Sequence, residues 1–119
     1  YYGLGVQKLS EGAYATARAA FQQVLDEFPN DPRAADAQYQ IAESYYQEEE
    51  YGSALSALEL VPRQWPSSAR AAGALYRAGV IAEEMGEQSR AREYYEEVRQ
   101  RYPDSDEARQ AQARLREIS

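Results

Sequence analysis

Apolar residues recur along this chain in a fixed order, and that order itself repeats. Ala17, Phe21 and Val24 are spaced four and three residues apart, which places them on one face of a helix. An internal period of about 20–50 residues is the signature of a stacked repeat architecture. The same order returns at intervals of 37 residues, as Ala54, Leu58 and Val61 and then as Ala91, Tyr95 and Val98. The pattern therefore predicts consecutive copies of one helical unit.

Proline marks the end of each copy. The pairs Phe28-Pro29, Trp65-Pro66 and Tyr102-Pro103 lie 37 residues apart, and a residue that precedes proline is disfavoured in the helical conformation. Two positions after each proline stands a residue suited to capping the next helix, and these residues are Asp31, Ser68 and Ser105. We therefore expect helices over residues 1–11, 13–28, 32–48, 51–62, 68–85, 88–102 and 105–118.

Two residues of the second copy, Glu49 and Pro62, depart from the repeat. Gly12 and Gly86 fall at the turn inside the first and third copies, where a helix end favours a positive φ. Glu49 stands at that position in the second copy, so we expect its turn to be built differently. Pro62 falls inside a predicted helix, and we expect it to bend or stop that helix near Val61. Either local packing or contact with a partner would account for this proline.

The placement of small residues resembles the tetratricopeptide repeat, in which two antiparallel helices approach closely at glycine and alanine. The first copy carries this pattern as Tyr1, Leu4, Gly5, Ala17, Phe21 and Pro29. The resemblance implies an all-α fold: a right-handed superhelical stack of three helical hairpins with a 37-residue period, plus a C-terminal capping helix. We expect a single domain over residues 1–119, with repeats at about 1–30, 31–67 and 68–104 and the capping helix at 105–118.

The amino-acid composition excludes several classes of partner and of catalytic chemistry. The net charge of −7 makes nucleic acid a poor partner. The charge favours a partner that is basic, polar or aromatic-seeking, and the alternative is that it serves only to keep the protein in solution. The chain has no Cys and no His, so Cys–His or Ser–His–Asp catalysis and the usual zinc sites are excluded. Runs such as Glu48-Glu49-Glu50 are typical of a solvated helix face. We expect no enzyme, no metal and no cofactor.

The chain also lacks a run of about 18 apolar residues, so we expect no direct membrane insertion. It begins at Tyr1, which already fits a repeat position, and this favours a fragment of a longer protein. Any oligomerisation would then go through a region outside this chain.

A second 37-residue series predicts where a partner binds. Tyr2, Tyr39 and Tyr76 lie one residue past a core position on the first helix of each hairpin, which lines the concave side of such stacks. Tyrosine suits binding surfaces because it buries a large area and keeps a polar tip. Repeat-to-repeat packing is the alternative role for these rings. The full predicted partner-binding set is Tyr2, Val6, Tyr39, Glu43, Tyr46, Tyr76, Val80 and Glu83.

This set differs from the Lys, Asn and Arg clamp with which some tetratricopeptide proteins hold a C-terminal carboxylate. It is acidic and aromatic, so we expect a helix or an extended segment with apolar and basic side chains.

The stretch over residues 34–46, with Glu50-Tyr51 and Ala54-Leu55, resembles the C-terminal repeat domain of the Tol-Pal system's periplasmic cell-division coordinator, as does Arg101-Tyr102-Pro103-Asp104-Ser105. The resemblance implies a periplasmic domain, an upstream coiled coil that trimerises, and binding to TolA. Gln40, Glu49-Glu50 and Pro62 depart from that family's pattern.

Similar repeats occur in the lipoprotein of the outer-membrane β-barrel assembly machinery, so a scaffold of outer-membrane protein assembly is the alternative, with a generic tetratricopeptide scaffold beside it. Two further alternatives for the function are a carboxylate hydrolase that acts on peptidoglycan and a structural spacer without a ligand.

Overall fold

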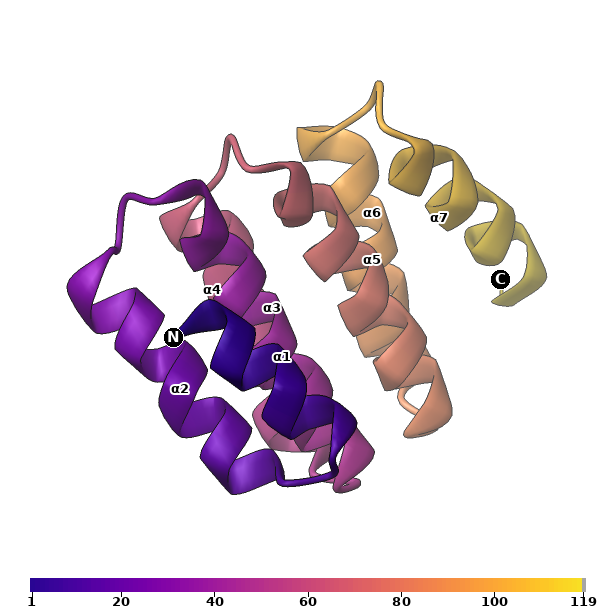
Figure 1. The fold of residues 1–119 in the computed structure, drawn as a ribbon. Coiled ribbons are helices and arrows are strands. Elements are labelled where there is room, and N and C mark those ends of the chain that lie inside the picture. Colours follow the sequence, from indigo (N-terminus) through magenta and orange to yellow (C-terminus); the bar gives the residue numbers. More distant parts are fainter. Residues whose placement is uncertain (119) are drawn as a thin grey trace.

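A computed structural model describes residues 1–118, and within that range the chain is all-helical. The helices follow one another along a stack, with α1 and α2 at one end and α7 at the other (Figure 1). The predicted fold class is confirmed, and each predicted helix is present within one or two residues at either end. The helices are α1 (Tyr2–Ser10), α2 (Tyr14–Glu27), α3 (Pro32–Gln47), α4 (Tyr51–Gln64), α5 (Ala69–Glu84), α6 (Gln88–Arg101) and α7 (Asp106–Ile118).

The odd-numbered helices form one side of the stack and the even-numbered helices form the other. Each helix packs on the helix that follows it, and α1, α3, α5 and α7 also contact one another in sequence. Among residues 1–118 the even-numbered helices make no such contacts with each other. The odd-numbered helices therefore lie closer together, and we call the surface that they share the inner face.

The turns between hairpins are fixed by the predicted caps. The Asp31 carboxylate accepts a hydrogen bond from the Arg33 backbone N–H at 2.8 Å, and the Ser68 hydroxyl accepts one from Arg70 at 3.0 Å. The Ser105 hydroxyl accepts from the Ala108 N–H at 3.0 Å. These bonds satisfy amide donors that a helix start leaves without partners, so all three predicted caps are confirmed.

The aromatic residue before each later proline also ties neighbouring turns together. The Trp65 indole N–H donates to the Pro29 carbonyl at 2.9 Å, and the Tyr102 hydroxyl donates to the Pro66 carbonyl at 2.9 Å. The turns are therefore linked at the same spacing as the sequence repeat.

The turn at Glu49 has the same construction as the turns at the two glycines, so the prediction of a different turn was wrong. Glu49 has φ 62°, close to 79° at Gly12 and 78° at Gly86. Its N–H donates to the Tyr46 carbonyl and the next N–H donates to Tyr45, which is the pattern at both glycine turns. The hydrogen bonds of the turn impose the left-handed backbone on a residue that disfavours it.

Glu49→Gly is expected to raise the free energy of unfolding by about 0.5–1 kcal/mol. Removing the Cβ relieves about 1–2 kcal/mol of left-handed strain, and the greater freedom of glycine in the unfolded chain offsets part of that gain. Urea unfolding would measure the change. Glu49→Ala is the control, because it removes the carboxylate and retains the Cβ. Equal stability of the two variants would contradict the strain at this position.

Pro62 was predicted to bend or stop its helix near Val61, and the stop was wrong because the helix continues past the proline. The helix α4 continues to Gln64, which is the position where α2 and α6 also end. Proline removes its own N–H donor and its ring crowds the carbonyl four residues earlier, but the Trp65 N–H still bonds the Val61 carbonyl at 2.8 Å. The Pro62 carbonyl accepts a hydrogen bond from the Arg101 guanidinium at 3.3 Å. The turn after the helix, rather than the proline, sets its end.

The close contact inside each hairpin joins a small residue to a large one. The ring of Phe21 covers Gly5, and the ring of Tyr95 covers Gly79, where an added Cβ would lie 2.4 Å from a ring carbon. The second hairpin has Ala42 at the glycine position and Leu58 at the aromatic position, and both are buried. Small and large residues therefore compensate one another across each hairpin.

Candidate functional site

The predicted tyrosine series lies on the inner face, and each ring is half-buried. Tyr2, Tyr39 and Tyr76 come from α1, α3 and α5. The ring of Tyr2 meets Phe21 edge-on with 5.7 Å between centroids, and the ring of Tyr76 lies 5.6 Å from Tyr95. These rings therefore pack within the domain and keep part of their surface exposed, which is compatible with both predicted roles.

The two valines of the predicted set differ in exposure. Val6 is 44% exposed on α1, whereas Val80 on α5 is half-buried. Val6 is therefore the open apolar member of the set, and substituting it disturbs little of the core.

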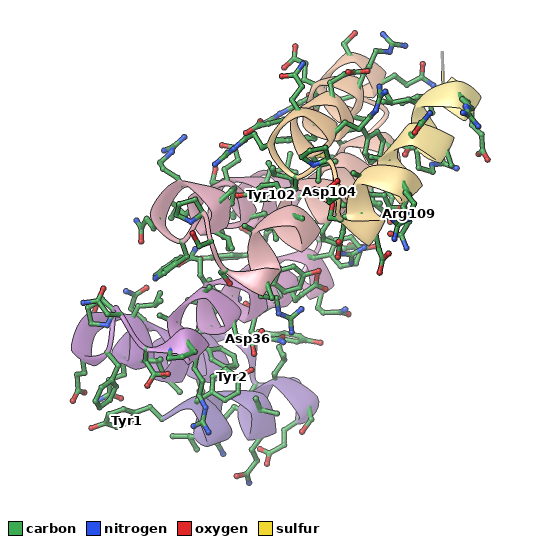
Figure 2. All side chains as sticks on the ribbon, turned by 90° about the horizontal axis from the view of Figure 1, so that it is seen from above. Tyr1, Tyr2, Asp36, Tyr102, Asp104 and Arg109 are labelled. Carbon is green, nitrogen blue, oxygen red and sulfur yellow. The ribbon has the colours of Figure 1, made fainter. Side chains whose placement is uncertain are left out.

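Ion pairs connect the odd-numbered helices across the inner face. Asp36 on α3 pairs with Arg70 on α5 and also accepts a hydrogen bond from the Tyr2 hydroxyl. Figure 2 shows Tyr2 and Asp36 lying close together. Glu43 pairs with Arg77 at 2.7 Å, again from α3 to α5. Asp36 and these arginines were not among the predicted residues, although both pairs share a separation of 34 residues.

The next ion pair ties the capping helix to the same face. Glu83 on α5 pairs with Arg114 on α7 and accepts a hydrogen bond from the buried Tyr95 hydroxyl. Hydrogen bonding from Arg114 is the main cause that holds the pKa of Glu83 below its usual range. The two predicted carboxylates, Glu43 and Glu83, are therefore both engaged by arginines, and the inner face is less acidic than its sequence indicates.

Arginines also lie over the tyrosine rings. The guanidinium of Arg33 is 5.7 Å from the centroid of Tyr2, and that of Arg70 is 4.6 Å from the centroid of Tyr39. Such contacts contribute about 0.5–1 kcal/mol at exposed sites. Burial, followed by the hydrogen bond to Asp36, raises the pKa of Tyr2 to about 12. On the inner face, the rings of Tyr2 and Tyr39 are therefore each covered by an arginine.

Tyr46 lies toward the other end of α3 and is held in the same way. Its hydroxyl donates to the Glu84 carboxylate at 2.7 Å, and the Arg77 guanidinium lies 4.4 Å from its ring centroid. Its ring is also 5.5 Å from Tyr51 on α4. The predicted partner-binding residues therefore come together on one face, and most of them already have a partner within the domain.

A cleft of about 520 Å³ between α4 and α6 holds the strongest candidate for a catalytic carboxylate pair. The carboxylates that line it are Glu59, Glu93 and Glu97. Of the pair formed by Glu59 and Glu97, Glu59 accepts a hydrogen bond from Tyr94, and Glu97 pairs with Arg101 at 2.9 Å. These two carboxylates are engaged by neighbouring side chains rather than poised on either side of a substrate. Within residues 1–118 no group of three or more Asp or Glu side chains is arranged to hold a metal ion.

The described helices, taken with the comparisons, define a class of protein. Tetratricopeptide folds of this kind are typically non-catalytic interaction modules. A tetratricopeptide-repeat family matches residues 73–105. The fold of the described helices is therefore of the tetratricopeptide type.

The sequence matches the outer membrane lipoprotein family YfiO over residues 1–84, and the chain belongs to that family. A search of curated proteins finds no match. No helix within residues 1–118 is long and apolar enough to cross a membrane.

Solved structures share the fold at low sequence identity. The N-terminal domain of stress-induced protein-1 from C. elegans is 16% identical, with a TM-score of 0.75 over 94% of this chain and 89% of that one. The first repeat domain of Spaghetti (RPAP3), bound to the HSP90 peptide SRMEEVD, is 22% identical, with a TM-score of 0.70 over 98% and 86%. The TPR2AB domain of yeast Sti1, in its pHSP90 complex, is 17% identical, with a TM-score of 0.74 over 98% of this chain and 46% of that one.

Proposed function

We propose that this chain is a periplasmic scaffold of outer-membrane protein assembly, and that it holds a segment of a partner protein on its inner face. The observation that carries the proposal is the match to the outer membrane lipoprotein family over residues 1–84. That match favours the assembly scaffold over the Tol-Pal coordinator. It also supports a location in the cell envelope.

The chemistry of the inner face indicates the kind of segment. Half-buried tyrosines offer flat apolar area with polar tips, and Val6 adds an open apolar contact. The carboxylates Asp36, Glu43 and Glu83 are already paired with arginines. A segment with apolar side chains fits this surface better than a strongly charged one, and it binds as a helix or an extended strand.

An acidic tail like the HSP90 peptide bound by the RPAP3 domain is a poor match for this face. The predicted contact positions hold Tyr, Val and Glu instead of a set of free cations. The arginines present, such as Arg70 and Arg77, are taken up by Asp36 and Glu43.

The Tol-Pal coordinator remains a second proposal, because a specific stretch of sequence favours it. The residues from Ala34 to Tyr46 and from Arg101 to Ser105 resemble that family. In this case the partner would be TolA, and the role would lie in cell division.

A pair of titrations separates the two proposals. Calorimetry would measure the affinity of the domain for the periplasmic part of TolA and, separately, for the periplasmic part of the β-barrel assembly machinery. Binding to the second alone supports the assembly scaffold, and binding to TolA alone supports the coordinator. Binding to neither would contradict both proposals.

Val6→Ser is expected to weaken binding of the partner found in those titrations by about three- to tenfold, because it removes an apolar contact from the inner face. Leu4→Ser is a matched control: Leu4 is 46% exposed, almost the same as Val6 at 44%, and its register equivalents Ile41 and Ala78 are core positions rather than inner-face positions. The control should bind as the unmodified chain does. Equal effects of the two variants would remove the inner face from the proposal.

A further inference from the structure

The three tyrosines of the inner face differ in what lies over them. Arg33 and Arg70 occupy the same position of the 37-residue repeat, and each lies over the tyrosine that precedes it by 31 residues. The equivalent residue for Tyr76 is Glu107, at the start of α7. Tyr76 therefore has a carboxylate at the repeat position where Tyr2 and Tyr39 have a cation. No arginine lies over Tyr76 within residues 1–118.

The carboxylate of Glu107 also differs from the other acids on this face. Asp36, Glu43 and Glu83 each pair with an arginine, whereas Glu107 makes no ion pair or hydrogen bond with any residue between 1 and 118. Glu107 is only half-exposed, and it shares the first turn of α7 with Asp106, where the helix dipole favours negative charge. Glu107 therefore lacks a side-chain cation on a surface where Asp36, Glu43 and Glu83 each have one.

The space beside Glu107 is open because of a glycine. Gly73 occupies the repeat position of Asp36, so Tyr39 lacks the carboxylate that accepts the hydroxyl of Tyr2. A Cβ on Gly73 would lie 3.7 Å from the Glu107 Oε2 atom. The hydroxyls of Tyr39 and Tyr76 have no hydrogen-bond partner within residues 1–118. Burial raises the pKa of Tyr39, and Glu43 and Glu107 add to that effect, so Glu107 lies on the same side as these rings.

We propose that Glu107, Gly73 and Tyr76 form a subsite for a basic side chain of the partner segment. An arginine or lysine there would pair with Glu107 and lie against Tyr76, as Arg33 and Arg70 lie against Tyr2 and Tyr39. The neighbouring cation, Arg70, is engaged by Asp36 and leaves Glu107 available. The subsite rests on the proposed function, because it lies on the inner face and specifies one residue of the segment held there.

The test uses two acetylated peptides with apolar flanks. One carries arginine between two leucines, and the other carries citrulline, which has the same shape and no charge. Nuclear magnetic resonance would follow the Gly73 amide and the Tyr76 ring during titration of the chain. The arginine peptide should shift both signals and bind about three- to tenfold more tightly than the citrulline peptide, as an exposed ion pair and ring contact together allow.

Variants separate the subsite from the general attraction of a cation to a chain of net charge −7. Glu107→Gln should abolish the preference for arginine, and Glu107→Arg should abolish it too, because that side chain would restore the series and occupy the place over Tyr76. Asp106→Asn is the matched control: it removes one charge from the same turn and should retain the preference.

The outcomes distinguish this inference from the proposed function. Equal affinity of both peptides, with shifts on Tyr2 and Tyr39 but none on Tyr76, would overturn the subsite and leave inner-face binding intact. Shifts confined to the even-numbered helices, or no binding of either peptide, would overturn the subsite as well, whereas the proposed function is decided by the titrations with whole periplasmic partners. A preference that Asp106→Asn abolishes equally would reduce the effect to net charge and overturn the assignment of Glu107.

Discussion

Gly79→Ala is expected to lower the free energy of unfolding by about 1–3 kcal/mol, although alanine is the better helix former by about 1 kcal/mol. The added Cβ would lie 2.4 Å from a ring carbon of Tyr95. That ring is fully buried and its hydroxyl is bound to Glu83, so it has no room to move aside. Urea unfolding followed by circular dichroism would measure the loss.

The control is Gly52→Ala, because no atom lies within 4 Å of its added Cβ. This variant should be about 0.5–1 kcal/mol more stable than the unmodified chain. If both alanine variants were stabilised alike, the close approach of α5 and α6 would be contradicted.

A double variant tests the reason for the loss. Gly79→Ala together with Tyr95→Leu reproduces the pair that the second hairpin uses, Ala42 and Leu58. Because leucine leaves room for the new Cβ, the two substitutions should be coupled favourably by about 1 kcal/mol. Strict additivity would mean that the two positions do not compensate one another.

Alkaline unfolding between about pH 10 and pH 12 is the second large effect. Burial is the main cause that raises the pKa of Tyr2, Tyr39, Tyr94 and Tyr95 in the folded chain, to about 12 at Tyr2, from the usual 10.0. Carboxylates add to this effect, through hydrogen bonds from Tyr2 to Asp36, Tyr94 to Glu59 and Tyr95 to Glu83. A folded-state pKa above the unfolded value stabilises the folded state fully below pH 10, and that contribution is lost as the pH rises toward the folded pKa.

The size of this effect is comparable with the stability of a small domain. Each unit of pKa difference is about 1.4 kcal/mol for a group, and partial exposure reduces that figure here. A combined loss of about 3–5 kcal/mol is a large share of the 5–15 kcal/mol typical of domains. The part of the phenolate absorbance that comes from these four tyrosines should therefore appear only as helical circular dichroism is lost.

Tyr94→Phe should move the midpoint of this transition to higher pH, because one shifted phenol is removed. Tyr1→Phe, at a half-exposed ring, should leave the midpoint in place. Ionisation of all eleven tyrosines while helical dichroism stays constant would contradict the assignment of the buried hydroxyls to folded-state hydrogen bonds.

The sequence predicted the helices well because their ends are decided locally. Asp31, Ser68 and Ser105 cap the helices that follow them, and each aromatic-proline pair closes the helix before it. The different turn at Glu49 and the helix stop at Pro62 were predicted wrongly for one reason. Local preference opposes a left-handed glutamate and a proline within a helix, but the surrounding hydrogen bonds outweigh a cost of about 1–3 kcal/mol at each.

The inner face was predicted in part. Its tyrosines were placed on the correct helices, because a 37-residue series must return to the same side of the stack. Their contact with a partner stays a prediction. The arginines that neutralise Asp36, Glu43 and Glu83 were missed, because each pair joins residues more than thirty positions apart.

The sequence by itself determined the period, the helix ends and the side of the stack on which each tyrosine lies, because these depend on neighbours within one repeat. Only the tertiary structure decided the charge state of the inner face and the place of Glu107 within it. Which carboxylate finds a cation depends on how closely successive hairpins approach, and that distance is set by packing between repeats rather than by any local preference.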